Sequence, residues 1–540
     1  MQDVDRRRLL AGGVTALAMG GVARAQPVQA VALASTTNGP VRGAQAEGLQ
    51  VFKGVRYGAP PVGPLRFKAP VKPQAWTTPA DATRYGAPAI QMASASNLAP
   101  PTTDLSRSFA PIFPIREETA AASEDCLFLN VWTPATDGKR RPVMVWLHGG
   151  GFAYGSGAWP MYDGSNFAKR GDVVVVTVNH RLNALGYLNL AEIAGPAYAD
   201  SGNAGMLDLV LALQWVRDNA PAFGGDPRNV TIFGESGGGV KVSNLLAMPS
   251  ARGLFHKAVI QSGPGLSGVP KAAATASARA ILAELKIDPT NTAALQSVPA
   301  ADLIKAAYAV QAKAPPGAGV RFLSPVVDGR VLPADPFTPA ASPLGRDIPV
   351  MVGANKDEMT LFVASEPWFG RLTDEQLTAR AAAMPKGAAM LAALKASRPG
   401  YSPSHYMAAL MSWGGILGGS VTLADRKAAQ GGAPVYAYRL DWETPVGGGM
   451  LKSPHTLEIP LVFDQVETNR ALVGPGEAPT RLARLMSDSW LAFARTGNPN
   501  TRALPNWPRY DPARRPTMVF DVQPRVVNDP EADVRKVLQS

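Results

Sequence analysis

Cysteine is almost absent from this chain, which has one, Cys126, among 540 residues. A single thiol excludes an intramolecular disulfide. Together with only five histidines, it leaves no group with the ligand spacing of a zinc site, so we expect neither a metal nor another cofactor. Cys126 lies in an alternating segment, 123–132, that predicts a strand. The thiol is therefore expected to be buried and unreactive.

Acidic residues are fewer than basic ones, and long apolar runs are missing. The formal net charge is +11, but no dense run of Lys and Arg with interleaved aromatic residues follows residue 25, so no nucleic-acid partner is expected. No segment has about 18 uninterrupted apolar residues, so no membrane anchor is expected. A hydrophobic content of 46% with 18% charged residues is typical of a globular protein.

Residues 1–25 predict an export signal. Three arginines at positions 6–8 precede an apolar stretch from residue 9 to residue 22, and Ala23-Arg24-Ala25 is a small-x-small cleavage site before Gln26. The paired arginines indicate the twin-arginine route, with a general secretory signal as the alternative. Either route predicts an exported protein, periplasmic or secreted.

Residues 26–540 have no internal repeat and no Gly/Ser linker, which favours a single domain. Apolar runs predict strands at 142–147, 172–179, 230–233, 256–261, 348–353 and 435–439, and helical spacing occurs at 205–219 and 480–496. Continuous apolar strands separated by helices imply an α/β fold with a large, mostly parallel central sheet covered on both faces. Alanine-rich spans at about 268–320 and 373–428 predict helical insertions.

A Gly-x-Ser-x-Gly turn, Gly234 to Gly238, lies between a β-branched run and a segment of helical spacing. Strand, tight turn and helix in that order are what a nucleophile elbow requires, with Ser236 as the nucleophile. Glycines beside the serine let the turn close without a Cβ clash. The pentapeptide alone is a weak motif, and a flexible glycine turn is the alternative.

Ser236 needs N–H donors for the oxyanion, a base and an acid. The predicted strand 142–147 is followed by His148 and three glycines, Gly149, Gly150 and Gly151. Lipases and esterases use such a motif as an oxyanion loop, and the N–H of Gly237 adds a donor from the elbow. An ordinary strand-end loop is the alternative.

The base is found by elimination. Four histidines lie in the glycine loop, at the ends of buried strands or in a helical insertion: His148, His180, His256 and His405. His455 follows the last predicted strand, which suits the order Ser, acid, His. Two adjacent carboxylates, Asp357 and Glu358, follow the strand at 348–352, and the residues alone do not choose between them. Asp328 is a competitor that is more typical of a turn.

These motifs together resemble the type-B carboxylesterases and cholinesterases. The matching segments, over about residues 38–512, are 54–61, 123–132, 148–152, 179–182, 223–227, 233–238, 353–358, 455–458 and 496–499. The resemblance implies an α/β-hydrolase fold whose helical insertions form a cap over the active site. It implies Glu358 as the acid, His455 as the base, and the amides of Gly150, Gly151 and Gly237 as oxyanion donors. Ser262 would be a supporting residue near the triad.

The chain departs from this family at two places. Gly237 stands where members usually carry alanine, and Ala89 stands where the family's first disulfide partner of Cys126 is expected, so the loop at about 89–125 has no bridge. That loop also has no tryptophan, which cholinesterases use to bind choline by cation–π attraction, so choline esters are not expected as substrates.

The resemblance implies a serine hydrolase that cleaves small-molecule carboxylic esters through an acyl-enzyme. A lipase or an amidase using the same triad is the alternative. A non-catalytic cholinesterase-like binding domain is a further alternative, against which the presence of Ser236, Glu358 and His455 argues. Candidate walls of the substrate pocket are Phe152, Tyr154, Trp159 and Trp413, although plain core packing is the favoured interpretation of each.

Overall fold

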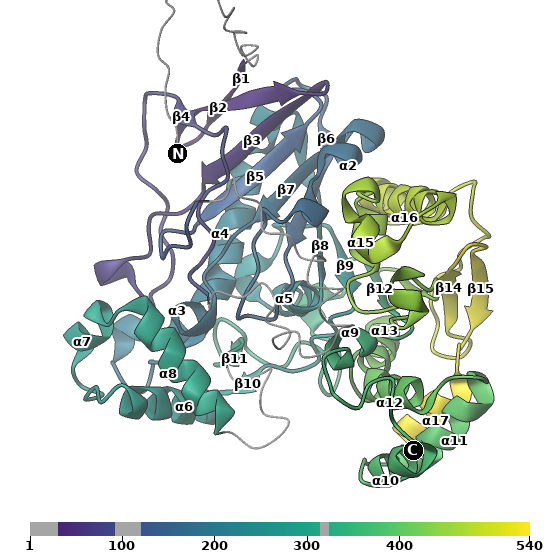
Figure 1. The fold of residues 1–540 in the computed structure, drawn as a ribbon. Coiled ribbons are helices and arrows are strands. Elements are labelled where there is room, and N and C mark those ends of the chain that lie inside the picture. The colour runs from purple at the N-terminus through teal and green to yellow at the C-terminus, as the bar shows by residue number, and fades with distance from the viewer. Residues whose placement is uncertain (1–30, 92–119, 314–322) are drawn as a thin grey trace, which may run out of the picture.

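The structure is a computed structural model that describes residues 31–91, 120–313 and 323–540. The predicted export signal lies outside these residues, as does most of the loop at 89–125. Within the described residues the chain forms a 13-stranded sheet. Figure 1 shows this sheet running across the molecule, from the N-terminal strands in purple to the C-terminal strands in yellow.

The centre of the sheet is parallel and its edges are antiparallel. In spatial order, the parallel strands are β7 (Val174–Val178), β6 (Arg141–Leu147), β8 (Gly225–Glu235), β9 (Lys257–Gln261), β12 (Val350–Asn355), β13 (Val435–Leu440) and β14 (Pro516–Phe520). The antiparallel strands are β1 (Val31–Thr36), β2 (Gly39–Ala46), β3 (Leu49–Arg56) and β5 (Phe128–Thr133) at one edge and β15 (Arg525–Asn528) at the other. A short strand, β4 (Ala80–Asp81), pairs with β2. The predicted mostly parallel sheet is confirmed.

Side chains alternate between the two faces of the sheet because successive residues of a strand point in opposite directions. In β6, Val143 and Val145 pack with the helices of one face, which are α4 (Ala204–Asn219), α5 (Gly237–Leu245) and α13 (Gly418–Ala429). Met144 and Trp146 pack with the helices of the other face, which are α2 (Ser165–Gly171), α14 (Glu458–Val462) and α16 (Glu477–Thr496). Both faces are therefore covered, as the continuous apolar strands predict.

The order of the strands places a crevice at the ends of β6 and β8. The chain leaves β6 toward β7 on one side and later returns with β8 on the other side. In open α/β sheets, ligands bind at such a reversal, outside the carboxyl ends of the strands. The glycine loop follows β6 and Ser236 follows β8, so both lie at this position.

Two helical groups lie beside the sheet, one at the lower left and one at the lower right of Figure 1. One contains α3 (Asn183–Tyr187), α6 (Lys271–Glu284), α7 (Thr292–Ser297) and α8 (Ala300–Ala312). The other contains α10 (Asp374–Ala382), α11 (Gly387–Ser397), α12 (Pro403–Ser412) and the C-terminal α17 (Ala532–Gln539). The helical insertions predicted from alanine-rich composition are found in both groups.

One helical stretch in the described residues, Pro403–Ala429, is long and apolar enough to cross a membrane by length and composition alone. It consists of α12, the π-helical segment η10 (Trp413–Leu417) and α13. Of its most apolar window, 61% is buried inside the protein. Its apolar side chains pack against the second helical group and the sheet, as in the core helix of a globular domain.

Cys126 is a free and fully buried thiol, as predicted, but the strand predicted over 123–132 begins only at Phe128. Burial raises the pKa of this thiol well above its ordinary value, which makes it unreactive. Ala89 lines the same small pocket as Cys126. In place of a disulfide, backbone pairing joins Ala89 to Ser123, whose N–H donates to the Pro88 carbonyl at 2.9 Å.

Candidate active site

Ser236 lies on the turn between β8, which ends at Glu235, and α5, which begins at Gly237. Its backbone has φ 55° and ψ −122°, a conformation that a residue with a Cβ rarely adopts. The Ser236 N–H donates to the carbonyl of Gln261 on neighbouring β9 at 2.9 Å, which helps to hold this conformation. Ser236 is partly exposed between two buried neighbours, so the turn presents the serine outward. The predicted order of strand, strained turn and helix is what the structure has.

The glycine loop contacts the elbow through its backbone. Gly150 and Gly151 have φ 82° and 61°, in the left-handed region that favours glycine. A Cβ placed on Gly237 would lie 2.3 Å from the carbonyl oxygen of Gly151. Since real Cβ atoms do not approach backbone so closely, the absence of a side chain at 237 permits this contact. The structure therefore brings the three predicted oxyanion donors together.

His455 lies in the loop between β13 and α14 and is buried. Its Nδ1 lies 2.5 Å from Oε2 of Glu358. Its Nε2, on the other side of the ring, lies 3.1 Å from Oε1 of Glu235. The ring of Phe362 packs against the imidazole with centroids 4.9 Å apart. His455 and Ser236 line one pocket.

The two adjacent carboxylates after β12 have different partners. Glu358 faces His455, and its Oε1 accepts the backbone N–H of Asn355 at 2.6 Å. Asp357 points to the second helical group, where it accepts from Nη1 of Arg398 at 2.9 Å and from the hydroxyl of Tyr401 at 3.0 Å. Geometry thus separates the two candidates that the residues alone left open.

Asp328, the third candidate, forms a turn. Its Oδ1 accepts the backbone N–H groups of Arg330 and Leu332 at 2.9 and 3.1 Å. These bonds give Asp328 a local structural role.

Ser262 joins the site through a further carboxylate. Its hydroxyl donates to Oε1 of Glu458 at 3.2 Å, and Nδ2 of Asn355 donates to Oε2 of Glu458 at 2.6 Å. The same Nδ2 donates to the carbonyl of Pro454, next to His455, at 2.7 Å. Ser262 and Asn355 thus hold Glu458 behind the imidazole.

Three buried carboxylates, Glu235, Glu358 and Glu458, surround this one imidazole. Burial and the neighbouring carboxylates raise the pKa of Glu235 well above its ordinary value, and the charge of His455, which lowers this pKa, only partly offsets them. Burial and the charge of Glu358 raise the pKa of Glu458 to about 7. For His455, burial disfavours the charged form, but Glu235 and Glu358 outweigh it and raise the pKa to about 9. The carboxylates therefore favour an imidazolium at this position.

Sequence reasoning missed Glu235, although it is the residue between Gly234 and the serine. Its position in the motif could have indicated a role, because the residue before the nucleophile is the last residue of the strand and lies beside the nucleophile. Only the fold shows that its carboxylate reaches the imidazole from the side opposite Glu358.

The other histidines are engaged elsewhere. His148 and His180 stack with ring centroids 5.0 Å apart, and burial lowers the pKa of each well below its ordinary value. His405 bonds to the hydroxyl of Ser402 at 2.8 Å and to the carbonyl of Met450 at 2.9 Å. His256 lies at the start of β9, where its Nδ1 accepts the N–H of Val230 at 3.2 Å. The elimination that selects His455 agrees with these positions.

The pocket above Ser236 has aromatic walls. Its lining consists of Gly149, Gly150, Tyr154, Trp159, Tyr162, Glu235, Ser236, Leu361, Phe362, His455 and Thr456. Two of the predicted wall residues, Tyr154 and Trp159, are among them. The other two candidates have the core packing that the sequence favoured for them: Phe152 packs in the core, and Trp413 lies in the second helical group with its Nε1 donating to Glu531 at 2.7 Å.

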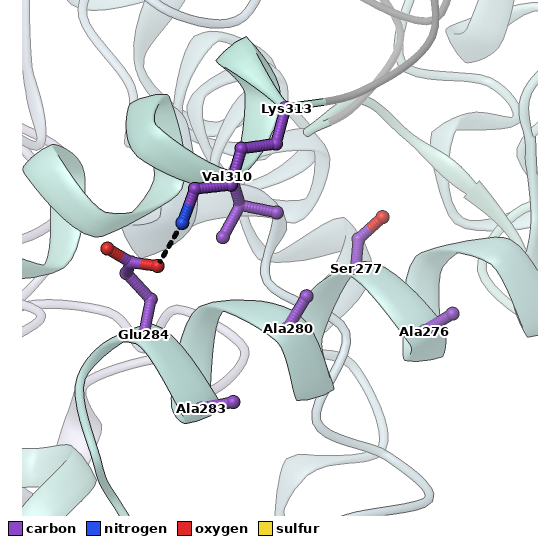
Figure 2. A pocket seen from close by; sticks show the side chains of 7 residues that line it. All are labelled: Ala276, Ser277, Ala280, Ala283, Glu284, Val310 and Lys313. Carbon is purple, nitrogen blue, oxygen red and sulfur yellow. Dashed lines mark hydrogen bonds and ion pairs between the residues drawn. The ribbon is translucent and has the colours of Figure 1, made fainter.

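A wide, open hollow lies away from this site, between α6 and α8 (Figure 2). Figure 2 shows one ion pair across it, Lys313 to Glu284 at 2.8 Å, beside alanine, serine and valine side chains. The residues drawn include neither an imidazole nor a strained serine, so this hollow does not have the chemistry of the pocket above Ser236.

Comparison with known proteins agrees with this arrangement. Residues 30–536 match the model of the carboxylesterase family. The chain is 38% identical over 511 residues to the para-nitrobenzyl esterase of Bacillus subtilis (strain 168), covering 94% of this chain and 98% of that protein. It is 33% identical over 490 residues to the phenmedipham hydrolase of Pseudarthrobacter oxydans, covering 89% and 94%.

Among solved structures, the carboxylesterase EST55 of Geobacillus stearothermophilus is similar with a TM-score of 0.79 at 39% identity, over 94% of this chain and 99% of that one. The family and the α/β-hydrolase fold predicted from the sequence are confirmed. The chain belongs to the carboxylesterase family and is a carboxylic ester hydrolase.

Proposed function

We propose that Ser236, His455 and Glu358 form the catalytic triad of this esterase. The observation that carries the assignment is the 2.5 Å contact between Nδ1 of His455 and Glu358, in the same pocket as Ser236. Ser236 Oγ attacks the ester carbonyl carbon while His455 Nε2 takes its proton. Glu358 holds the ring in the tautomer that leaves Nε2 without a proton, and the surrounding carboxylates stabilise the imidazolium that forms.

The negative charge that develops on the carbonyl oxygen is held by the backbone N–H groups of Gly150, Gly151 and Gly237. Collapse of the tetrahedral intermediate breaks the bond to the alcohol, which leaves with the proton from His455. A water molecule then attacks the acyl-enzyme by the same steps, His455 takes its proton, and the acid and free Ser236 are released.

The aromatic pocket favours esters with a compact aromatic or apolar group. Trp159 and Tyr162 stack with ring centroids 5.8 Å apart, and Phe362 lies beside the imidazole. The relative named for para-nitrobenzyl esters supports an aromatic group on the substrate. A rate increase only above the solubility limit of the substrate would favour the lipase alternative, and faster cleavage of matched anilides would favour the amidase.

The test is hydrolysis of a panel of chromogenic esters of increasing acyl length by the wild type and by Ser236→Ala. We expect kcat to fall by about four orders of magnitude or more while the folded state persists. Unchanged hydrolysis by a clean Ser236→Ala preparation would contradict the triad.

We also propose that residues 1–25 export the protein to the periplasm or beyond by the twin-arginine route. The support is the triple arginine, the apolar stretch and the Ala23-Arg24-Ala25 site. Mass analysis of the exported protein should give Gln26 as its first residue. Export that persists after all three arginines become lysine would indicate the general secretory route.

A further inference from the structure

A buried lysine lies in the helix that follows the nucleophile. Lys241 is in α5, the helix that begins after Ser236, and none of its side chain is exposed. Its Nζ donates to the backbone carbonyl of His148 at 2.9 Å and lies 5.3 Å from the ring centroid of Phe152. His148 is the residue that joins β6 to the glycine loop. The ammonium thus ties the elbow helix to the start of that loop.

This lysine is costly to the fold. A buried ammonium loses the hydration of its charge, and one carbonyl acceptor replaces little of it. Burial lowers the pKa of Lys241 to about 7, against the opposing charge of Glu235. A methionine of similar length in this apolar helix face would remove the penalty. A costly group at this place therefore indicates a role besides stability.

The glycine loop has bonds of its own, between Nδ1 of His148 and the Gly149 carbonyl at 2.8 Å and from the N–H of Tyr154 to the Gly150 carbonyl at 3.2 Å, and it is also held from outside. Gly149, Gly150 and Gly151 have no side chains, and two of them hold left-handed backbone conformations. Helix α5 contacts this loop through Gly237, which meets the backbone of Gly151, and through Lys241, which holds the carbonyl of His148. One rigid helix therefore positions both the nucleophile and the loop.

We propose that Lys241 is a positioning residue of the oxyanion hole. Its ammonium holds the His148 carbonyl and so fixes where the N–H groups of Gly150 and Gly151 point. The inference depends on the proposed triad, because it assigns Lys241 to the same oxyanion.

The experiment compares Lys241→Met with a matched control, Lys427→Met. Lys427 is also buried, and its Nζ donates to the backbone carbonyl of Arg346 at 2.9 Å, but it lies in α13, outside the pocket of Ser236. For Lys241→Met we expect kcat to fall about tenfold to a hundredfold with KM within threefold, since loss of a whole oxyanion donor costs about 10²–10³. Binding of a boronic-acid analogue of the tetrahedral intermediate should weaken by a similar factor.

The thermal midpoint of Lys241→Met should equal or exceed that of the wild type, because a buried charge has been removed. Lys427→Met should leave kcat unchanged. A folded Lys241→Met enzyme with kcat within twofold of the wild type would overturn the proposal. If that variant does not fold, Lys241→Gln is measured instead: a lower kcat at unchanged KM supports the proposal, and a wild-type kcat overturns it.

Labelling by a fluorophosphonate separates this inference from the triad assignment. The wild type and Lys241→Met should both be labelled at Ser236, and Ser236→Ala should not be. Failure to label the wild type contradicts the triad itself. Labelling of both, with equal kcat values, contradicts only the role of Lys241.

Discussion

Replacing Gly237 with alanine tests whether the contact between elbow and glycine loop sets the oxyanion geometry. The added Cβ would lie 2.3 Å from the carbonyl oxygen of Gly151 and 2.5 Å from its N and Cα. All three are backbone atoms, so no flexible side chain can move aside. Because ordinary contact begins at 3.4 Å, the loop has to withdraw by about 1 Å or the start of α5 has to shift.

The size of the effect follows from that displacement. A hydrogen bond of about 2.9 Å that lengthens by about 1 Å is lost as a bond. Loss of one oxyanion donor lowers kcat by about 10²–10³, or about 2.7–4 kcal/mol of transition-state stabilisation. Alanine is a better helix former than glycine, by up to about 1 kcal/mol, so α5 itself is not expected to unfold. We therefore expect a folded enzyme with a much lower kcat for Gly237→Ala.

The assay is steady-state hydrolysis of a chromogenic aryl ester, with kcat and KM determined separately and the thermal midpoint measured alongside. Gly414→Ala is the control, because a Cβ at Gly414 has no atom within 4 Å. Members of the family usually carry alanine where this chain has Gly237. The variant therefore also tests whether the glycine loop can adopt a position further from the elbow. A folded Gly237→Ala enzyme with kcat within threefold of the wild type would refute the reasoning.

Three further predictions concern the carboxylates. Glu235→Gln removes a charge that raises the pKa of the His455 imidazole. Since catalysis needs the neutral imidazole, the acid limb of the kcat/KM profile should move to lower pH by about one to three units. An unmoved limb would show that the Glu235 charge does not affect the pKa of His455. Glu358→Gln should lower kcat about ten-thousand-fold with little change in stability, because an amide can donate to Nδ1 and so favours the tautomer that carries its proton on Nε2. Asp357→Asn should instead lower the free energy of unfolding by about 3 kcal/mol, because the buried Arg398 loses a charged partner, and should leave kcat near the wild-type value. Denaturant unfolding and steady-state kinetics on both variants check this pair, and a reversed pattern would exchange the roles of the two acids.

Much of the fold's centre is predictable from the sequence because its strands are buried on both faces. Such strands are continuous apolar runs, as in 142–147 and 230–233, and these correspond to β6 and β8. The antiparallel edge strands β1–β3 and β15 were not predicted. Edge strands are partly exposed, as Val31 and Leu33 are, and their pairing partners lie on other strands. Residue pattern alone does not specify such pairing.

The sequence by itself determined the chemistry of this protein. Three features carry it: a serine on a glycine turn, a glycine loop after an earlier strand, and the one histidine left by elimination. Their order along the chain suits an ester hydrolase. These are local features or features of chain order, and both can be read without a fold.

Only the tertiary structure decided what surrounds the imidazole. Asp357 and Glu358 are neighbours in the chain, yet one meets Arg398 and the other meets His455, because adjacent side chains leave the backbone in different directions. Glu235 and Lys241 gain their roles only where β8 and α5 come to lie against loops distant in sequence. Contacts of this kind depend on the tertiary packing of the chain, and residue identity alone does not predict that packing.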